Sequence, residues 1–225
     1  LRILMPISIV ANDTRLEGRT PLSTPSFMRL DVNEGTPLEY FFDRCSSISD
    51  VQGGISTLYI MAHDAETSFA GSSIGGNGIV FCKELVNFRN VDRFELLADK
   101  VKHIVLLICS AAATPFDMHL IDVADPELSR TFHGDGDELC RQMAIHSKAK
   151  VTVARETQSY MAEEYCTTFA GFEVYCEGDT VDFGEWEGTI VQYGANGRIL
   201  AEWTNPREWR DSHGVIHDPR LEPRT

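Results

Sequence analysis

The order of the apolar segments limits the fold of this chain more than any other feature of its sequence. The segments Ser56–Ala62, Val101–Ile108 and Val151–Ala154 are short, bounded and rich in aliphatic residues, as buried strands are. Between them lie segments with apolar residues at helical spacing, at Asn90–Lys100 and from about Gly136 to Ser147. Strands that alternate with helices predict an α/β fold, with a mostly parallel sheet and helices on its faces.

Further elements are predicted before this central part. Arg2–Ala11 fits a buried strand and Met28–Val32 a short one, whereas Pro37–Ile48 has helical spacing with proline in the first turn. A short strand is predicted at Ile79–Cys82. Asn90 is expected to cap the helix that follows it. The apolar stripe of that helix comprises Val91, Phe94, Leu97 and Ala98.

The C-terminal part has a different pattern. Phe172–Tyr175, Thr189–Tyr193 and Arg198–Trp203 are short runs of strand character, separated by Gly-Asp, Gly-Glu and Asn-Gly. Asn196-Gly197 between two such runs indicates a β-hairpin, so an antiparallel appendage is expected. We therefore divide the chain into an α/β core over residues 1–165, a β-hairpin extension packed on it over 166–204, and a polar tail over 205–225.

Composition and charge exclude several classes of function. The chain is 43% hydrophobic and 24% charged, as globular proteins are, and its net charge is −14. Such an excess of Asp and Glu over Lys and Arg argues against nucleic-acid binding, which depends on basic side chains that contact phosphates. The longest apolar run, Ile104–Ala113, is too short for the ~20 residues of a membrane span. Six cysteines in 225 residues are too few for a disulfide scaffold, so we expect most of them to be buried thiols in a reducing compartment and the protein to be cytoplasmic. They form no C-x-x-C pair, so we expect no metal site.

Two residues at predicted strand ends have the chemistry of a nucleophile and its base. His63 follows the run STLYIMA, and Cys109 follows the run VKHIVLLI. Active sites of parallel sheets form at the carboxyl ends of the strands, so adjacent strands would bring both residues to one rim. A cysteine thiolate attacks carbonyl carbon, and a nearby imidazole takes and returns the proton. The alternative is a strand-end histidine and a buried cysteine without a catalytic role.

The order of these segments resembles that of the caspase-like cysteine peptidases, a superfamily of caspases, gingipains, separases and bacterial CHAT-type domains. The quoted motifs are Tyr59–Asp64, Gly75–Ile79, Asn90–Lys100 and His103–Ala112, and the likeness extends over about residues 55 to 160. The histidine of caspases lies about 50 residues before the cysteine, and here the interval is 46. The resemblance implies a caspase-like sandwich and a cysteine endopeptidase that acts on peptides or proteins without a cofactor.

The sequence departs from the family pattern beside the histidine. The family has His-Gly, whereas this chain has His63-Asp64. The Gln-Ala-Cys-x-Gly motif that surrounds the cysteine of caspases is also absent. Backbone N–H groups of Asp64 and Cys109 would hold the oxyanion. Because the Asp64 carboxylate adds negative charge there, a second hypothesis is a catalytically inactive binding or scaffolding domain with the same fold.

A preference for basic residues before the scissile bond is expected in several caspase-like families. Such a preference requires an acidic pocket, because a carboxylate can form a bidentate pair with arginine. Asp13, Asp117 and Glu156 lie just beyond three predicted strand ends and are the candidates for that pocket. The alternative is that all three are solvated loop charges.

Two other motifs give weaker hypotheses. Gly71–Gly75 fits G-x-S-x-G and makes Ser73 the nucleophile of a serine hydrolase, although such an elbow must join a strand directly to a helix. His213 and His217 have the spacing of two metal ligands on a helix, but Gly214 and Pro219 disfavour a helix there. We therefore expect neither a serine hydrolase nor a metal site.

Overall fold

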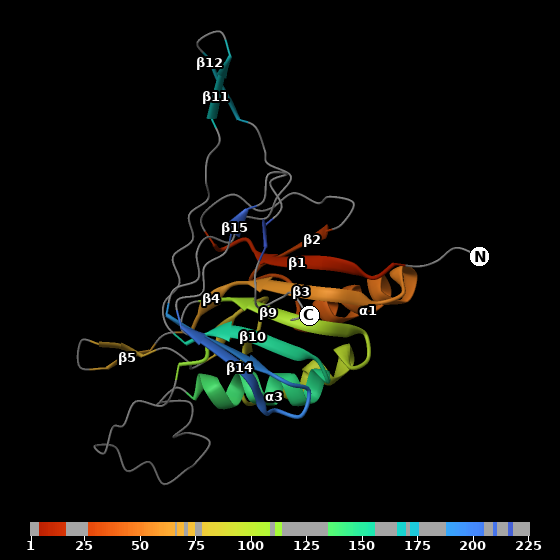
Figure 1. Ribbon diagram of the computed structural model, residues 1–225, viewed down its shortest axis with the longest axis vertical. Helices are drawn as coiled ribbons and strands as arrows, with labels where there is room; N and C mark the ends of the chain where they lie inside the picture. Colours follow the sequence, from red (N-terminus) through yellow and green to blue (C-terminus); the bar gives the residue numbers. More distant parts are fainter. Residues whose placement is uncertain are drawn as a thin grey trace.

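A mixed seven-stranded sheet forms the centre of the fold, with the strand order β14-β13-β10-β9-β3-β1-β2 (Figure 1). The computed structural model describes residues 5–16, 27–65, 67–69, 72–74, 78–108, 111–113, 135–155, 166–169, 172–175, 188–204, 209–210 and 216–217. The strands of the sheet are β1 (Ile7–Asp13), β2 (Phe27–Val32), β3 (Ile55–Met61), β9 (Val101–Leu107), β10 (Lys150–Ala154), β13 (Thr189–Tyr193) and β14 (Ile199–Thr204).

The strands from β2 to β10 run parallel to one another. β13 is antiparallel to β10, and β14 is antiparallel to β13, with which it forms a hairpin. The prediction of an α/β fold with a mostly parallel sheet and a C-terminal antiparallel part is therefore confirmed. The hairpin continues the main sheet, because β13 pairs with β10 along its edge. Its turn contains the expected Asn196-Gly197, with Gly197 at a φ of +75° and its N–H bonded to the carbonyl of Gly194.

Three helical elements of the described chain pack against one side of this sheet. They are α1 (Leu38–Gln52), the 3₁₀ helix η1 (Val91–Leu97) and α3 (Gly136–Ser147). Their buried side chains join one apolar cluster with alternate residues of the strands. A second, smaller cluster on the other side contains Leu16 and residues of the strands, among them Trp203 of β14, and none of the described helices contributes to it. None of these helices has the length and apolarity needed to cross a bilayer.

Specific residues cap the ends of both α-helices. Asp135 caps α3 by accepting a hydrogen bond from the N–H of Glu138, which confirms the predicted start of this helix. The N-terminus of α1 is capped from another segment, because the N–H of Leu38 donates to the Glu84 carboxylate at 2.7 Å. Gly53 ends α1 in the left-handed conformation, with a φ of 76°. The predicted helix is confirmed, and it extends four residues beyond Ile48.

The predicted α-helix at Asn90–Lys100 is wrong in type and length, because the structure has a 3₁₀ helix over Val91–Leu97. Val91, Phe94 and Leu97 are buried as expected, but their strict three-residue spacing matches the 3₁₀ period. Asn90 does not cap this helix with its side chain. Its amide instead accepts from the N–H of Asn87 and donates to the carbonyl of Leu85, and so closes the preceding turn.

A buried polar row lies on the side of the sheet that carries the second cluster. The Nε2 atom of His103 on β9 is 2.7 Å from the hydroxyl of Thr152 on β10. That hydroxyl also accepts a hydrogen bond from the amide of Gln192 on β13, at 3.0 Å. Burial, with a smaller contribution from Lys150, lowers the pKa of His103 to about 3. The row therefore ties three neighbouring strands together while His103 is neutral.

Short antiparallel ladders complete the described structure. One three-stranded sheet, in the order β4-β7-β8, continues directly from β3. The predicted strand at Ile79–Cys82 corresponds to its middle member, and the predicted tail holds one two-residue ladder, β15–β16. The remaining strands are β4 (His63–Asp64), β5 (Thr67–Phe69), β6 (Ser72–Ile74), β7 (Ile79–Val80), β8 (Leu85–Val86), β11 (Cys166–Phe169), β12 (Phe172–Tyr175), β15 (Trp209–Arg210) and β16 (Ile216–His217).

Candidate functional site

The two strands that precede His63 and Cys109 are direct neighbours in the sheet. They are β3 and β9, which pair in parallel with a constant register from Ile55↔Val101 to Met61↔Leu107. The register offset is 46 residues, which is also the separation of His63 and Cys109 in the sequence. Cys109 itself lies outside the described residues. The structure thus confirms adjacent parallel strands before both residues, and the contact between the two side chains stays a prediction.

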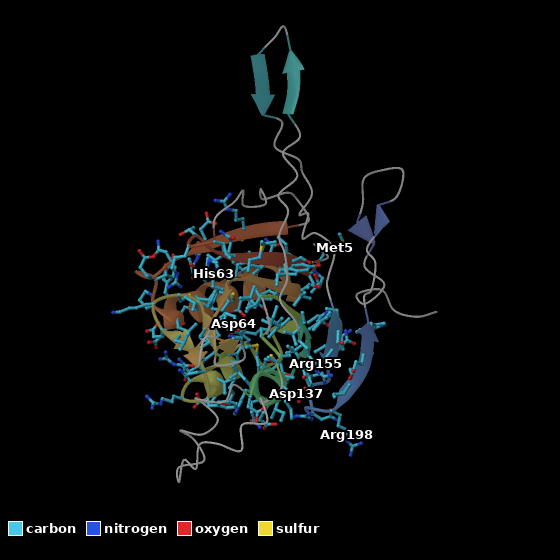
Figure 2. All side chains as sticks on the ribbon, turned by 90° about the vertical axis from the view of Figure 1, so that its left-hand side faces the viewer. Met5, His63, Asp64, Asp137, Arg155 and Arg198 are labelled. Carbon is cyan, nitrogen blue, oxygen red and sulfur yellow. The ribbon has the colours of Figure 1, made fainter. Side chains whose placement is uncertain are left out.

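His63 lies in β4, at the carboxyl end of β3, and its side chain is exposed. Its Nε2 atom is 3.4 Å from the backbone carbonyl of Arg15, which follows β1. A carbonyl oxygen only accepts hydrogen bonds, so this contact requires a proton on Nε2. The neutral ring then has Nδ1 as its basic nitrogen. Figure 2 looks onto the end of the sheet at which β4 lies and shows His63 on that surface.

Asp64, the residue after the histidine, is buried. Successive side chains of a strand point in opposite directions, so the Asp64 carboxylate faces away from the side of His63. It acts electrostatically on the thiol of Cys140 in α3, whose pKa burial raises and the carboxylates of Asp137 and Asp64 raise further. The charge of Asp64 is thus directed into the helix-covered side of the sheet.

The backbone of Asp64 has a defined orientation in the β4–β7 ladder. The N–H of Ala65 donates to the carbonyl of Gly78 at 3.0 Å, and Asp64 pairs with Ile79. Antiparallel ladders alternate hydrogen-bonded and non-hydrogen-bonded pairs, so Asp64 occupies a non-hydrogen-bonded position. Its N–H therefore points away from β7.

Asp13 ends β1 with its carboxylate in a bidentate ion pair with Arg15. Its side chain is only 1% exposed, and Nε of Arg15 donates to its Oδ1 atom at 2.7 Å. Hydrogen bonding to this carboxylate raises the pKa of Arg15 against the opposing effect of burial. Asp13 can therefore bind an arginine of a substrate only if the Arg15 guanidinium is displaced from its carboxylate. The other two residues proposed for a substrate pocket, Asp117 and Glu156, lie outside the described residues.

The short segment Ala111–Ala113, which begins two residues after Cys109, is held from three directions. The N–H of Ala112 donates to the carbonyl of Ala154 at the end of β10, at 3.1 Å. The N–H of Gly136 donates to the carbonyl of Ala113 at 3.0 Å, and the Cys140 thiol donates to the carbonyl of Ala111 at 3.6 Å. A Cβ atom at Gly136 would lie only 2.2 Å from the carbonyl oxygen of Ala111, so a glycine is required there.

A polar cluster between α3 and the sheet was not predicted. Arg155 directly follows β10, and its guanidinium donates to Asp137 of α3 and to Glu202 of β14, each at 3.2 Å. The Tyr193 hydroxyl also donates to Asp137, at 2.6 Å. Burial disfavours the charge of Asp137, but hydrogen bonds from Tyr193, Arg141 and Arg155 hold its pKa below the usual value. Figure 2 shows Arg155 and Asp137 together. The position of Arg155 directly after the run VTVA was the one available signal.

The structure also bears on the two weaker motifs. Ser73 lies in the middle of β6, where it pairs with Ser68 of β5, so no strand-to-helix elbow is formed around it. His217 lies in β16 rather than in a helix, and His213 lies outside the described residues. Within the described ranges, no group of three or more His, Cys, Asp or Glu side chains is arranged to hold a metal ion.

Comparison of the chain with protein-family models, with curated proteins and with solved structures found no match.

Proposed function

We propose that this protein is a caspase-like cysteine endopeptidase in which Cys109 is the nucleophile and His63 the acid–base partner. The observation that carries the proposal is the pairing of β3 with β9. The two strands are adjacent and parallel, and the chain continues from each by the same two residues to reach His63 and Cys109. Nucleophile and base then meet at the carboxyl rim of a parallel sheet, where such folds bind their ligands.

The hydrogen bond of His63 supports an acid–base role. A base in a catalytic dyad is oriented by a third group, and here the carbonyl of Arg15 accepts a hydrogen bond from Nε2–H. Nδ1 then takes the proton of the Cys109 thiol. The thiolate attacks the peptide carbonyl, and the imidazolium returns that proton to the departing amine, which leaves a thioester. Water, activated by the same nitrogen, hydrolyses the thioester to a carboxylic acid and restores the thiol.

The surroundings of the proposed dyad support the oxyanion step. The negative oxygen that develops on the substrate carbonyl would be held by the backbone N–H groups of Asp64 and Cys109. The orientation of the Asp64 N–H away from β7 favours this role. Of the small residues that follow Cys109, Ala111 and Ala112 are buried in the apolar core, so only the partly exposed Ala113 could adjoin the backbone of an extended peptide.

The competing proposal is a catalytically inactive binding or scaffolding domain. The presence of a carboxylate in Asp64, where the family has glycine, is the observation that favours it. Against it stands the direction of that carboxylate, which faces the helix-covered side of the sheet. The reactivity of Cys109 separates the two proposals.

Alkylation with iodoacetamide at neutral pH, mapped by mass spectrometry, tests the nucleophile. Cys45 and Cys82 are buried, and burial raises the pKa of both thiols to about 12, so neither competes. We expect Cys109 to react at least tenfold faster than Cys166, and His63→Gln to remove this advantage. Cys166→Ser is the matched control and should leave the rate at Cys109 unchanged. A Cys109 rate equal to that of Cys166, or unaffected by His63→Gln, would overturn the proposed dyad and favour the scaffolding domain.

We further propose that cleavage follows arginine or lysine. The net charge of −14 favours basic substrates at long range, and Asp117 and Glu156 would supply the pocket. A peptide-library profile in the presence of the active protein tests this preference. Acidic or aliphatic residues before the cut would contradict it and would leave the assignment of Cys109 and His63 intact.

A further inference from the structure

The ion pair of Asp13 and Arg15 also forms hydrogen bonds to the backbone of Cys82. Its carboxylate accepts a hydrogen bond from the N–H of Cys82 at 3.1 Å, and its guanidinium donates to the carbonyl of Cys82 at 2.8 Å. Both main-chain polar groups of Cys82 are thus bound by the pair. Cys82 has a φ of +60°, a conformation that few residues other than glycine adopt without support from their surroundings. The ion pair supplies that support.

The same ion pair is connected to His63 in two ways. Through the main chain, Cys82 lies two residues after Val80, and Val80 pairs with His63 in the β4–β7 ladder. Through the ring, the carbonyl of Arg15 lies 3.4 Å from Nε2 of His63. The backbone of Arg15 is fixed at this point because its own N–H also donates to the Asp13 carboxylate, at 3.1 Å. Asp13 therefore fixes both the strand that holds His63 and the carbonyl that faces its ring.

We propose that the partly buried Asp13–Arg15 ion pair positions His63 and sets its tautomer. With the Arg15 carbonyl held in place, the proton of the neutral imidazole stays on Nε2 and Nδ1 is presented as the base. The catalytic consequence rests on the proposed cysteine peptidase. The tautomer does not, because it depends only on contacts that the described residues make.

This inference gives Asp13 a different role from the one expected from sequence. A carboxylate that already accepts two guanidinium N–H groups and two backbone N–H groups has no oxygen lone pair left for strong binding of a substrate arginine. Asp13 is then a positioning residue. The two roles differ in their kinetics, because loss of a pocket carboxylate weakens substrate binding, whereas loss of a positioning group lowers the rate of the chemical step.

The chain offers a matched control on the neighbouring strand. Arg29 and Asp31 of β2 have the same two-residue spacing and the same bidentate geometry, with Nε to Oδ1 at 2.7 Å, but their pair is exposed. Asp13→Asn and Asp31→Asn therefore remove the same charge from the same kind of pair. Only the first pair is bonded to Cys82 and adjoins His63.

The direct readout is the nitrogen NMR spectrum of the histidine rings at pH 8, with His63 assigned from His63→Gln. We expect the Nε2–H tautomer alone in the parent protein and in Asp31→Asn, and the Nδ1–H tautomer to become populated beside it in Asp13→Asn. If Asp13→Asn does not fold, Arg15→Lys, which keeps the charge and loses the bidentate fork, is measured instead. An unchanged Nε2–H tautomer in the folded variant would overturn the inference.

The alkylation rate and peptide kinetics give the second readout. If Asp13 positions His63, Asp13→Asn lowers kcat and the alkylation rate of Cys109 at least tenfold with little change in KM. A rise in KM for arginine peptides alone, with the tautomer unchanged, would return Asp13 to the pocket and refute positioning. If the parent protein shows no enhanced reactivity of Cys109, the peptidase proposal fails, and the tautomer still decides the role of the ion pair.

Discussion

Gly136→Ala tests whether α3 holds the segment that follows Cys109. The added Cβ would lie 2.2 Å from the carbonyl oxygen of Ala111 and 2.9 Å from the nitrogen of Ala113, both backbone atoms. The two backbones must separate by about 1 Å to restore a normal contact, and overpacking of this kind costs about 1–3 kcal/mol. The hydrogen bond from Gly136 to Ala113 is lost in part, at about 1 kcal/mol. Against this, alanine is favoured over glycine in a helix by at most about 1 kcal/mol.

The net expectation is a loss of about 2 kcal/mol in the free energy of unfolding, measured by urea denaturation followed by circular dichroism. A shift of about 1 Å next to a catalytic group costs on the order of 100-fold in rate, so alkylation of Cys109 should slow strongly. Gly35→Ala is the control, because its Cβ would meet only the flexible side chain of Asn33, at 3.2 Å. A Gly136→Ala variant as stable as the parent protein would show that α3 does not hold the segment Ala111–Ala113 in this way.

Three further predictions concern stability. Burial holds the pKa of His103 at about 3, below the 6.5 of an exposed histidine, so the unfolded chain binds the proton more readily. Stability should therefore fall as the pH drops below 6.5, by about 3 kcal/mol at about pH 4, and His103→Asn should flatten this part of the denaturation profile. Glu84→Ala removes the cap of α1 and should cost about 1 kcal/mol in the same assay, with Glu95→Ala as an exposed control. Lys148→Gly relieves a left-handed residue with a φ of 52° at the end of α3 and should raise stability by about 0.5 kcal/mol, because the exposed ion pair that it loses contributes little; a lower melting temperature would contradict this.

The elements that sequence predicted well are those whose burial is uniform. The run Val101–Ile108 became β9 because its side chains enter an apolar cluster on both sides of the sheet. The helix from Gly136 is predicted because its apolar side is regular, and the structure adds the hydrogen bond by which Asp135 caps it. The 3₁₀ helix was missed because a spacing of three residues fits both helix types over two turns, and only tertiary packing decides between them.

The candidate site could be predicted only in part, for a physical reason. His63 and Cys109 stand out because each ends an apolar run, and the pairing of those runs follows from topology. The contact of His63 with Arg15 is to a backbone carbonyl, which any residue possesses, so no residue type signals it. The charge of Asp13 makes it a candidate for an acidic substrate pocket. Its ion pair with Arg15, two residues later, neutralises that charge, and this contact forms only because of the turn after β1.

If Cys109 and His63 act together, the distance between the Cys109 Sγ atom and the His63 ring in a crystal structure will show it. We expect Nδ1 to be the nearer nitrogen, within about 4 Å of the sulfur, with both groups facing one cleft. Nε2 should at the same time remain hydrogen-bonded to the carbonyl of Arg15. Side chains on opposite sides of the sheet, or a sulfur buried among the strands beyond reach of the ring, would contradict a joint role of Cys109 and His63.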